Sequence, residues 1–88
     1  MRSFYYTFGS DPEFPFGRND YVEVRATDHL QADLLFSQVH PKRQGSELIN
    51  CSFVYNEREW AKVGPKYYGD REPVEIIELK VTRREDEA

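Results

Sequence analysis

The chain has only one cysteine, no long apolar run and no signal-peptide pattern in its opening residues. Cys51 is its only cysteine, so an intramolecular disulfide is impossible and the cysteine-rich secreted class of small domain is excluded. The opening residues MRSFYYTF lack the apolar core of about 7 to 15 residues that a signal peptide needs. No stretch approaches the roughly 20 apolar residues of a membrane span. We therefore predict a soluble cytoplasmic protein that does not associate with a membrane.

Motifs that carry chemistry are equally scarce. His29, His40 and Cys51 are widely separated and form none of the close Cys or His pairs that are typical of zinc sites. No serine lies in a nucleophile-elbow pattern, and there is no glycine-rich phosphate-binding loop. Nothing in the sequence pairs two carboxyl groups in the unlike environments that general acid–base catalysis uses. The sequence therefore predicts a protein that is not an enzyme and has no metal site and no cofactor.

Positive charge is also in the minority, since the formal net charge is −4. Affinity for nucleic-acid phosphates depends on clustered Lys and Arg, so direct nucleic-acid binding is not expected to be the main task. A cluster of acidic side chains would instead attract a basic cleft on a protein partner. An alternative stays open, in which a small nucleic-acid-associated accessory protein stacks bases on its exposed tyrosines beside a few basic residues. The tyrosines of this alternative are Tyr5, Tyr67 and Tyr68, and the basic residues are Lys62, Lys66 and Arg71.

What the chain does have is a well-marked passage from a strand to a helix. Residues 48–55 alternate with period two, which is typical of a strand with one apolar face. Asn56 then suits a helix N-cap, and Glu59 is placed to complete a capping box with it. The inward side chains of this strand are expected to be Ile49, Cys51, Phe53 and Tyr55.

The same passage predicts how the helix is held and where it ends. Tyr55 just before the cap and Trp60 at the fourth helical position are the two sites of a hydrophobic staple. Gly64 followed by Pro65 predicts the C-terminus of this helix, because Gly adopts the left-handed cap conformation and Pro cannot continue a helix.

The other elements follow from the same rules. Strands are predicted at Phe4–Phe8, Tyr21–Ala26 and Val74–Thr82, and a helix is predicted over Asp28–His40, where Asp28 and Gln31 form a second possible capping box. Apolar residues on both faces of the first strand indicate an interior position in the sheet. The last residues, 83–88, are expected to form a frayed charged tail.

These elements predict an α+β fold in one domain over residues 1–82. The order is β-β-α-β-α-β, and we expect a single four-stranded mixed sheet with both helices on one face. Two successive strand–helix–strand units favour a largely parallel group of the last three strands, with the first strand antiparallel to a neighbour. A wholly antiparallel arrangement remains the alternative.

The helix over Asp28–His40 has two apolar faces. One stripe is expected to pack on the sheet, and Leu30 and Leu34 point roughly opposite to it. Either a loop, such as the segment around Phe14 and Phe16, covers these two leucines, or they form a partner surface. The stripe itself consists of Ala32, Leu35, Phe36 and Val39.

The segment Gly9–Asn19 is rich in Gly, Pro and Asp and predicts a loop. It carries Phe14 and Phe16 on either side of Pro15. We favour an interpretation in which these rings pack back over the edge of the sheet, and the alternative is an exposed recognition tip.

Three stretches, FYYTFGSDPEFPF, YVEVRATDHLQADLLF followed by HPKR, and NCSFVYNEREW, resemble a group of small phage- and mobile-element-encoded bacterial proteins. Some small acidic proteins of such origin are anti-CRISPR inhibitors, which bind a defence nuclease and block its access to DNA. The resemblance implies a phage context and carries over no site residues.

We therefore expect a non-enzymatic binding protein, monomeric or homodimeric, that inhibits a host defence nuclease complex by covering its nucleic-acid-binding surface. Its partner is a protein in the bacterial cytoplasm. The residues expected to bind this partner are Asp11, Glu13, Phe14, Phe16, Leu30, Asp33, Leu34, Tyr67 and Tyr68.

Overall fold

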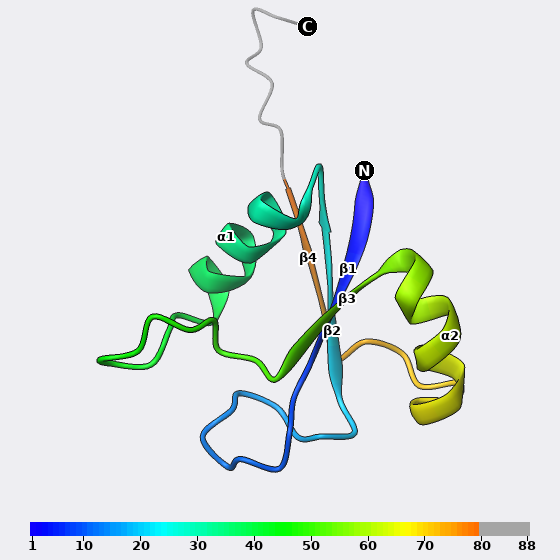
Figure 1. The fold of residues 1–88 in the computed structure, drawn as a ribbon, viewed down its shortest axis with the longest axis horizontal. Helices are drawn as coiled ribbons and strands as arrows, with labels where there is room; N and C mark the ends of the chain where they lie inside the picture. Colours follow the sequence, from blue (N-terminus) through cyan, green and yellow to red (C-terminus); the bar gives the residue numbers. More distant parts are fainter. Residues whose placement is uncertain (80–88) are drawn as a thin grey trace, which may run out of the picture.

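The fold is built around a four-stranded sheet with the strand order β3-β1-β2-β4 (Figure 1). The structure is a computed structural model that describes residues 1–79. It confirms an α+β fold with one mixed sheet and the predicted order of strands and helices. The elements are β1 (Arg2–Thr7), β2 (Tyr21–Ala26), α1 (His29–Val39), β3 (Phe53–Asn56), α2 (Glu57–Tyr67) and β4 (Glu75–Glu78).

Strand β1 lies in the interior of the sheet, as its apolar residues on both faces predict. It pairs antiparallel with β2 on one side and with β3 on the other, and β2 pairs parallel with β4. The last three strands therefore run in the same direction, but they do not form one parallel group. The expected grouping is wrong because β1 separates β3 from β2.

The two helices cover opposite faces of the sheet, so the prediction that both lie on one face is wrong. Tyr6 stacks on Phe36 of α1 with ring centroids 4.4 Å apart, whereas its neighbour Tyr5 stacks on Trp60 of α2 at 4.6 Å. Neighbouring residues in a strand point to opposite faces. The physical reason lies in the strand order: the two crossovers run in opposite directions across the sheet, and crossovers of one hand then lie on opposite faces (Figure 1).

The main core lies between α1 and the sheet. Ala32 and Phe36 of α1 are fully buried, and Leu35 packs against them. Val39 was expected in the same stripe but is 45% exposed. The ring of His40, just after the helix, lies next to Phe36 instead, at 5.2 Å between ring centroids. The sheet contributes Phe4, Tyr6, Phe8, Val22, Val24, Ala26 and Ile77.

Strand β3 is shorter than the alternation predicts, because it begins at Phe53 and not at Leu48. Phe53 pairs with Thr7 at the end of β1, so the residues before it have no further strand to pair with. The chain bends there, with the N–H of Cys51 donating to the Ile49 carbonyl at 2.8 Å. Cys51 consequently lies in irregular structure, where it packs partly buried against the core.

The capping box at the start of α2 is confirmed. The N–H of Glu59 donates to Asn56 Oδ1 at 2.8 Å, and the N–H of Asn56 donates to Glu59 Oε1 at 3.0 Å. The staple is also present, since the rings of Tyr55 and Trp60 are 5.8 Å apart.

Replacing Asn56 with alanine should lower the free energy of unfolding by about 1 kcal/mol, because the first turn of α2 loses its side-chain cap. Urea denaturation of the wild type and of Asn56→Ala measures this difference directly. An Asn56→Asp variant is the matched control, because Asp also caps helices and should retain most of the stability.

The prediction that this helix ends at Gly64 is wrong. Helix α2 continues to Tyr67, with Pro65 inside its last turns. Gly64 is buried beneath Trp60, and a Cβ atom built at position 64 would lie 2.7 Å from the indole ring. The glycine therefore serves close packing. The left-handed residue that follows the helix is Gly69, with φ of 58°.

The predicted end of the last strand at Thr82 and the predicted tail over residues 83–88 lie outside the described residues. Within residues 1–79, no helix combines the length and the apolar character needed to cross a membrane.

Candidate docking surface

Helix α1 is oriented by a cap at its N-terminus. Asp28 Oδ1 accepts the N–H of Gln31 at 2.8 Å, and Gln31 Oε1 accepts the N–H of Thr27 at 2.8 Å. The predicted capping box is therefore present in a modified form, since Gln31 reaches back to Thr27 and not to Asp28. With Phe36 fixed against the sheet, the opposite side of the helix faces outward.

Three leucines on this outward side form what we call the leucine surface. Leu30 and Leu34 of α1 are 72% and 59% exposed, and Leu48 of the segment before β3 is 78% exposed. All three line one open hollow of ≈ 360 Å³. The interpretation in which a loop covers Leu30 and Leu34 is wrong. The remaining lining residues are Asp33, Ser37, Lys42, Glu47 and Ile49.

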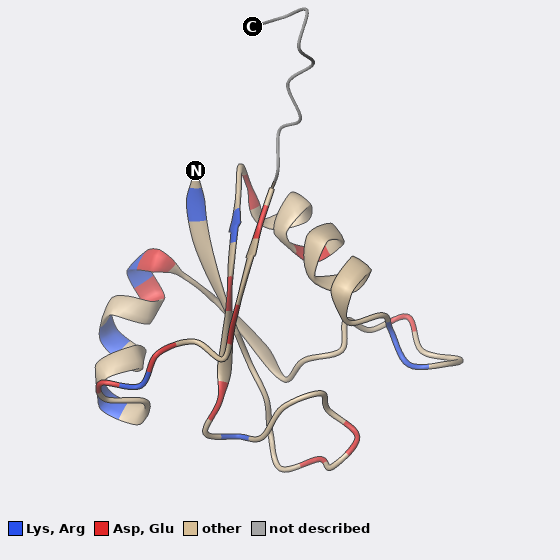
Figure 2. Cartoon of the chain, turned by 180° about the vertical axis from the view of Figure 1, so that it is seen from behind, with Lys and Arg blue, Asp and Glu red and all other residues tan. Residues whose placement is uncertain are grey.

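Asp33 lies at the rim of this hollow and anchors α1 to the sheet. Its carboxylate accepts the hydroxyl of Tyr6 at 2.6 Å and lies 3.3 Å from Nε2 of His29. Burial raises the pKa of the Tyr6 hydroxyl, and the hydrogen bond to Asp33 raises it further. Asp33 is the only Asp, Glu, Lys or Arg in α1, which leaves the helix largely uncharged (Figure 2).

Two acidic residues of the first loop, Asp11 and Glu13, share one cation of the protein. Asp11 lies 3.0 Å from Arg43 Nη1, and Glu13 lies 3.5 Å from the same atom. The N–H of Glu13 donates to Asp11, and together with Arg43 it lowers the pKa of the Asp11 carboxyl. Asp11 and Glu13 do not line the leucine surface, and the single Arg43 guanidinium offsets one of their two charges.

The aromatic side chains of this loop pack back onto the protein. Phe14 lies 6.1 Å from Phe8 between ring centroids, and the Arg43 guanidinium is 4.7 Å from the Phe14 centroid. Phe16 packs at 5.5 Å from Phe8 and at 5.3 Å from His40. Both rings are half-buried, as we favoured from the sequence.

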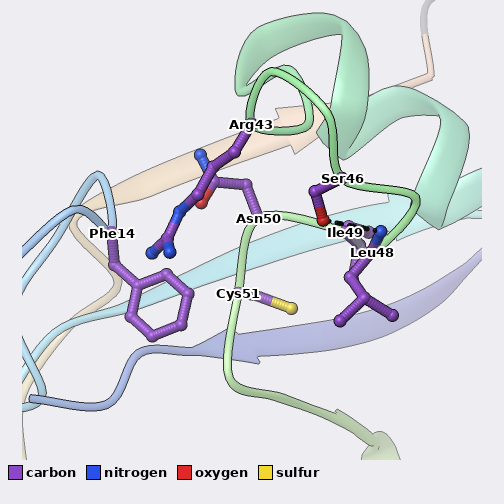
Figure 3. A pocket seen from close by; sticks show the side chains of 7 residues that line it. All are labelled: Phe14, Arg43, Ser46, Leu48, Ile49, Asn50 and Cys51. Atoms are coloured by element: carbon purple, nitrogen blue, oxygen red, sulfur yellow. Dashed lines mark hydrogen bonds between the residues drawn. The ribbon is translucent and has the colours of Figure 1, made fainter. Parts of the chain in front are cut away.

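A second, smaller hollow of ≈ 150 Å³ adjoins the leucine surface, because Leu48 and Ile49 line both. Figure 3 shows the Arg43 guanidinium extending toward Phe14 at one end of it. Arg43 Nη2 and Asn50 Oδ1 are buried there and have no hydrogen-bond partner within residues 1–79. One buried donor and one buried acceptor make this hollow polar at one end and apolar at the other.

Cys51 also lines the small hollow, but its thiol is not activated. Burial raises the pKa of Cys51 to about 12, and the Asp33 carboxylate raises it in the same direction. A reactive thiol needs the opposite shift, because the thiolate is the nucleophile.

Alkylation of Cys51 by iodoacetamide at pH 8 should be at least about a hundredfold slower in the native protein than in urea, because the thiolate fraction is small and the sulfur is buried. Mass spectrometry over time measures both rates. Because burial raises the pKa of Cys51, the buried neutral thiol stabilises the folded protein fully at pH values below the thiol pKa of the unfolded chain. This contribution to the free energy of unfolding is lost as the pH rises toward 12. Native alkylation as fast as in urea would contradict this packing.

Tyr67 and Tyr68 lie far from the leucine surface, at the end of α2 on the other face of the sheet. Tyr67 is 67% exposed. Tyr68 is half-buried, with its ring 5.3 Å from Tyr21 and 5.1 Å from Trp60. The predicted binding residues thus fall into three separate places: the leucines and Asp33 on α1, the first loop, and the end of α2.

Sequence reasoning missed two contributors to this region. Leu48 was expected in a strand, and no local pattern indicates that the chain bends beside α1. Arg43 was expected only as part of a basic spot, and its contacts with Asp11 and Phe14 join segments 32 and 29 residues apart in the chain.

Comparison with protein families, with curated proteins and with solved structures found no match. In the part of the chain that the structure describes, no group of three His, Cys, Asp or Glu side chains is arranged to hold a metal ion. The surfaces of this chain therefore carry the information about its function.

Proposed function

We propose that this protein is a non-enzymatic binding protein that docks on a protein partner through the leucine surface. The observation that carries the proposal is the exposure of Leu30, Leu34 and Leu48 around a single hollow. A scattered exposed leucine needs no explanation, but a contiguous apolar patch rimmed by polar residues marks interaction sites. Each leucine that becomes fully buried contributes about 1.5 to 3 kcal/mol.

The charges around the leucine surface favour a basic partner over a second copy of this chain. The rim holds the carboxylates of Asp33 and Glu47 against the single ammonium group of Lys42. The chain as a whole has a net charge of −4, so two copies repel each other at long range. A partner that frames an apolar side chain with Lys or Arg complements this surface.

The resemblance to phage-encoded proteins adds a narrower hypothesis, in which the partner is a host defence nuclease complex and the docked protein blocks its nucleic-acid-binding surface. A nucleic-acid-binding surface is rich in Lys and Arg, which complement the carboxylates at the rim of the leucine surface. Because Asp11 and Glu13 are paired with Arg43, we do not assign them to the contact. In this hypothesis the leucines anchor the inhibitor, and the acidic rim orients it.

The test uses Leu30→Glu/Leu34→Lys, which keeps the net charge and adds a favourable i,i+4 pair to α1. We expect this variant to lose the partner that the wild type captures from the bacterial host, because charges in a desolvated apolar contact cost several kcal/mol. The matched control is Val74→Glu/Ile76→Lys, which replaces two other exposed apolar side chains on the β4 side. The purified partner must then bind the wild type and the control with equal affinity.

Two further measurements decide between the general proposal and the narrower one. Association with the purified partner should slow as the salt concentration rises, because long-range attraction contributes to the rate. If the partner is a nuclease complex, the wild type should also prevent its binding to DNA, and Leu30→Glu/Leu34→Lys should not. A variant that binds the partner as well as the wild type does would remove the leucine surface from the function.

A further inference from the structure

A second surface lies on the α2 side of the sheet, and we call it the tyrosine groove. It is an open hollow of ≈ 360 Å³ between the first loop, the end of α2 and β3. Helices α1 and α2 cover opposite faces of the sheet, so the tyrosine groove is separate from the leucine surface. Its walls are formed by Arg18, Asn19, Tyr55, Val63, Tyr67 and Tyr68.

We propose that the tyrosine groove binds single-stranded nucleic acid. Exposed aromatic rings stack on bases of any sequence, and Tyr67 is a residue that is 67% exposed. Lys66 Nζ lies 5.4 Å from the centroid of this ring, so a cation accompanies the stacking surface. On the opposite wall, Arg18 supplies a charge for phosphate and Asn19 an amide for the edge of a base.

A basic stripe runs along α2 and reaches the groove at Lys66, whose ammonium group lies over Tyr67. Arg58, Lys62 and Lys66 follow each other at intervals of four residues, so they share one side of the helix, about 6 Å apart along its axis. All three are exposed, and among residues 1–79 none of them forms an ion pair. Figure 2 shows these basic positions along α2, in contrast to the nearly uncharged α1. The stripe offers a track for a backbone that leaves the groove.

The nearby carboxylates keep their charge and repel phosphate, but two of them are held in contacts within the protein. The Glu59 carboxylate is engaged in the capping box, and the Asp20 carboxylate accepts the N–H of Gly17 at 3.1 Å. Glu57 remains free of ion pairs in the described structure. A single strand gives a few phosphates to the stripe and an unstacked base to the tyrosines, whereas a duplex keeps its bases inside. The groove therefore suits single strands.

Fluorescence anisotropy of a labelled 20-nucleotide oligothymidylate at low salt tests the proposal. We expect a dissociation constant in the micromolar range, roughly 10⁻⁶ to 10⁻⁴ M, and binding that weakens as salt is added. Lys62→Glu/Lys66→Glu should weaken binding at least about tenfold. The matched control is Arg2→Glu/Lys42→Glu, which changes the net charge equally at exposed positions outside the groove and the stripe, and it should bind within about threefold of the wild type.

Stacking is tested separately at Tyr67. Tyr67→Ala should weaken binding about tenfold, and Tyr67→Phe should retain it, because the ring supplies the stacking surface. The same oligonucleotide annealed to its complement should bind more weakly than the single strand. The proposal is overturned if no binding is detected, if the control loses as much as Lys62→Glu/Lys66→Glu, if Tyr67→Ala binds like the wild type, or if the duplex binds as tightly.

Discussion

Replacing Phe36 with alanine should lower the free energy of unfolding by about 4 kcal/mol. Phe36 is fully buried, and its ring stacks on Tyr6 with the ring centroids 4.4 Å apart. The centroids of the Phe8 and His40 rings lie 6.2 Å and 5.2 Å away. Its removal takes away the transfer energy of the ring and leaves a cavity between α1 and the sheet that the surrounding aromatic side chains fill only in part. Urea denaturation, followed by far-ultraviolet circular dichroism, measures the loss.

The matched control for this prediction is Leu34→Ala, two residues earlier in the same helix. Leu34 is 59% exposed, so its replacement should change the free energy of unfolding by less than about 0.5 kcal/mol. Comparable losses for Phe36→Ala and Leu34→Ala would mean that the outward face of α1 is buried as well, and they would contradict its role as a free surface.

Replacing Trp60 with alanine should lower the free energy of unfolding by about 3 kcal/mol, the lower end for a large aromatic residue because the indole is only half-buried. Trp60 stacks on Tyr5 with the ring centroids 4.6 Å apart, and its centroid distances to Tyr21 and Tyr55 are 4.7 Å and 5.8 Å. A helix of 11 residues that includes a proline is not stable alone. We therefore expect α2 to lose helicity together with its contact to the sheet.

The Trp60→Phe variant keeps an aromatic ring at this position but makes it smaller. Its free energy of unfolding should fall by only about 1 kcal/mol, because an aromatic contact with Tyr5 remains. Circular dichroism at 222 nm and urea denaturation on both variants provide the comparison. If Trp60→Ala retained both the helix signal and the wild-type midpoint, the indole would not be what holds α2 to the sheet.

Local signals predicted most of the elements correctly. The alternation over Tyr21–Ala26 correctly predicted strand β2. The capping box of Asn56 and Glu59 was also predicted correctly, because a cap depends on residues only three positions apart. The interior place of β1 also followed from its own residues. These features are set within a few residues and need no knowledge of distant contacts.

The arrangement of the elements required contacts that local patterns do not contain. Because β3 pairs with β1 and β4 pairs with the far side of β2, the two crossovers run in opposite directions and the helices lie on opposite faces. Gly64 is a similar case, since a Gly-Pro pair usually ends a helix, but packing beneath Trp60 overrides that preference. In both cases a tertiary contact decided between two locally reasonable outcomes.

The candidate surface was predictable in part. Helical periodicity placed Leu30 and Leu34 opposite the core stripe, and the structure leaves them exposed. The third leucine, Leu48, reaches them only because the chain bends before β3, where β1 offers no partner. The pairing of Asp11 with Arg43 was equally invisible, since it joins two loops.

The central claim is that Leu30 and Leu34 belong to a docking surface and not to the core of this protein. Thermal and urea denaturation of purified Leu30→Glu/Leu34→Lys tests it most directly. We expect a cooperative transition within about 0.5 kcal/mol of the wild type, because both side chains are exposed and the new pair suits a helix. A loss of about 3 to 6 kcal/mol, the burial energy of two leucines, would show that the protein's own fold covers them and would contradict the claim.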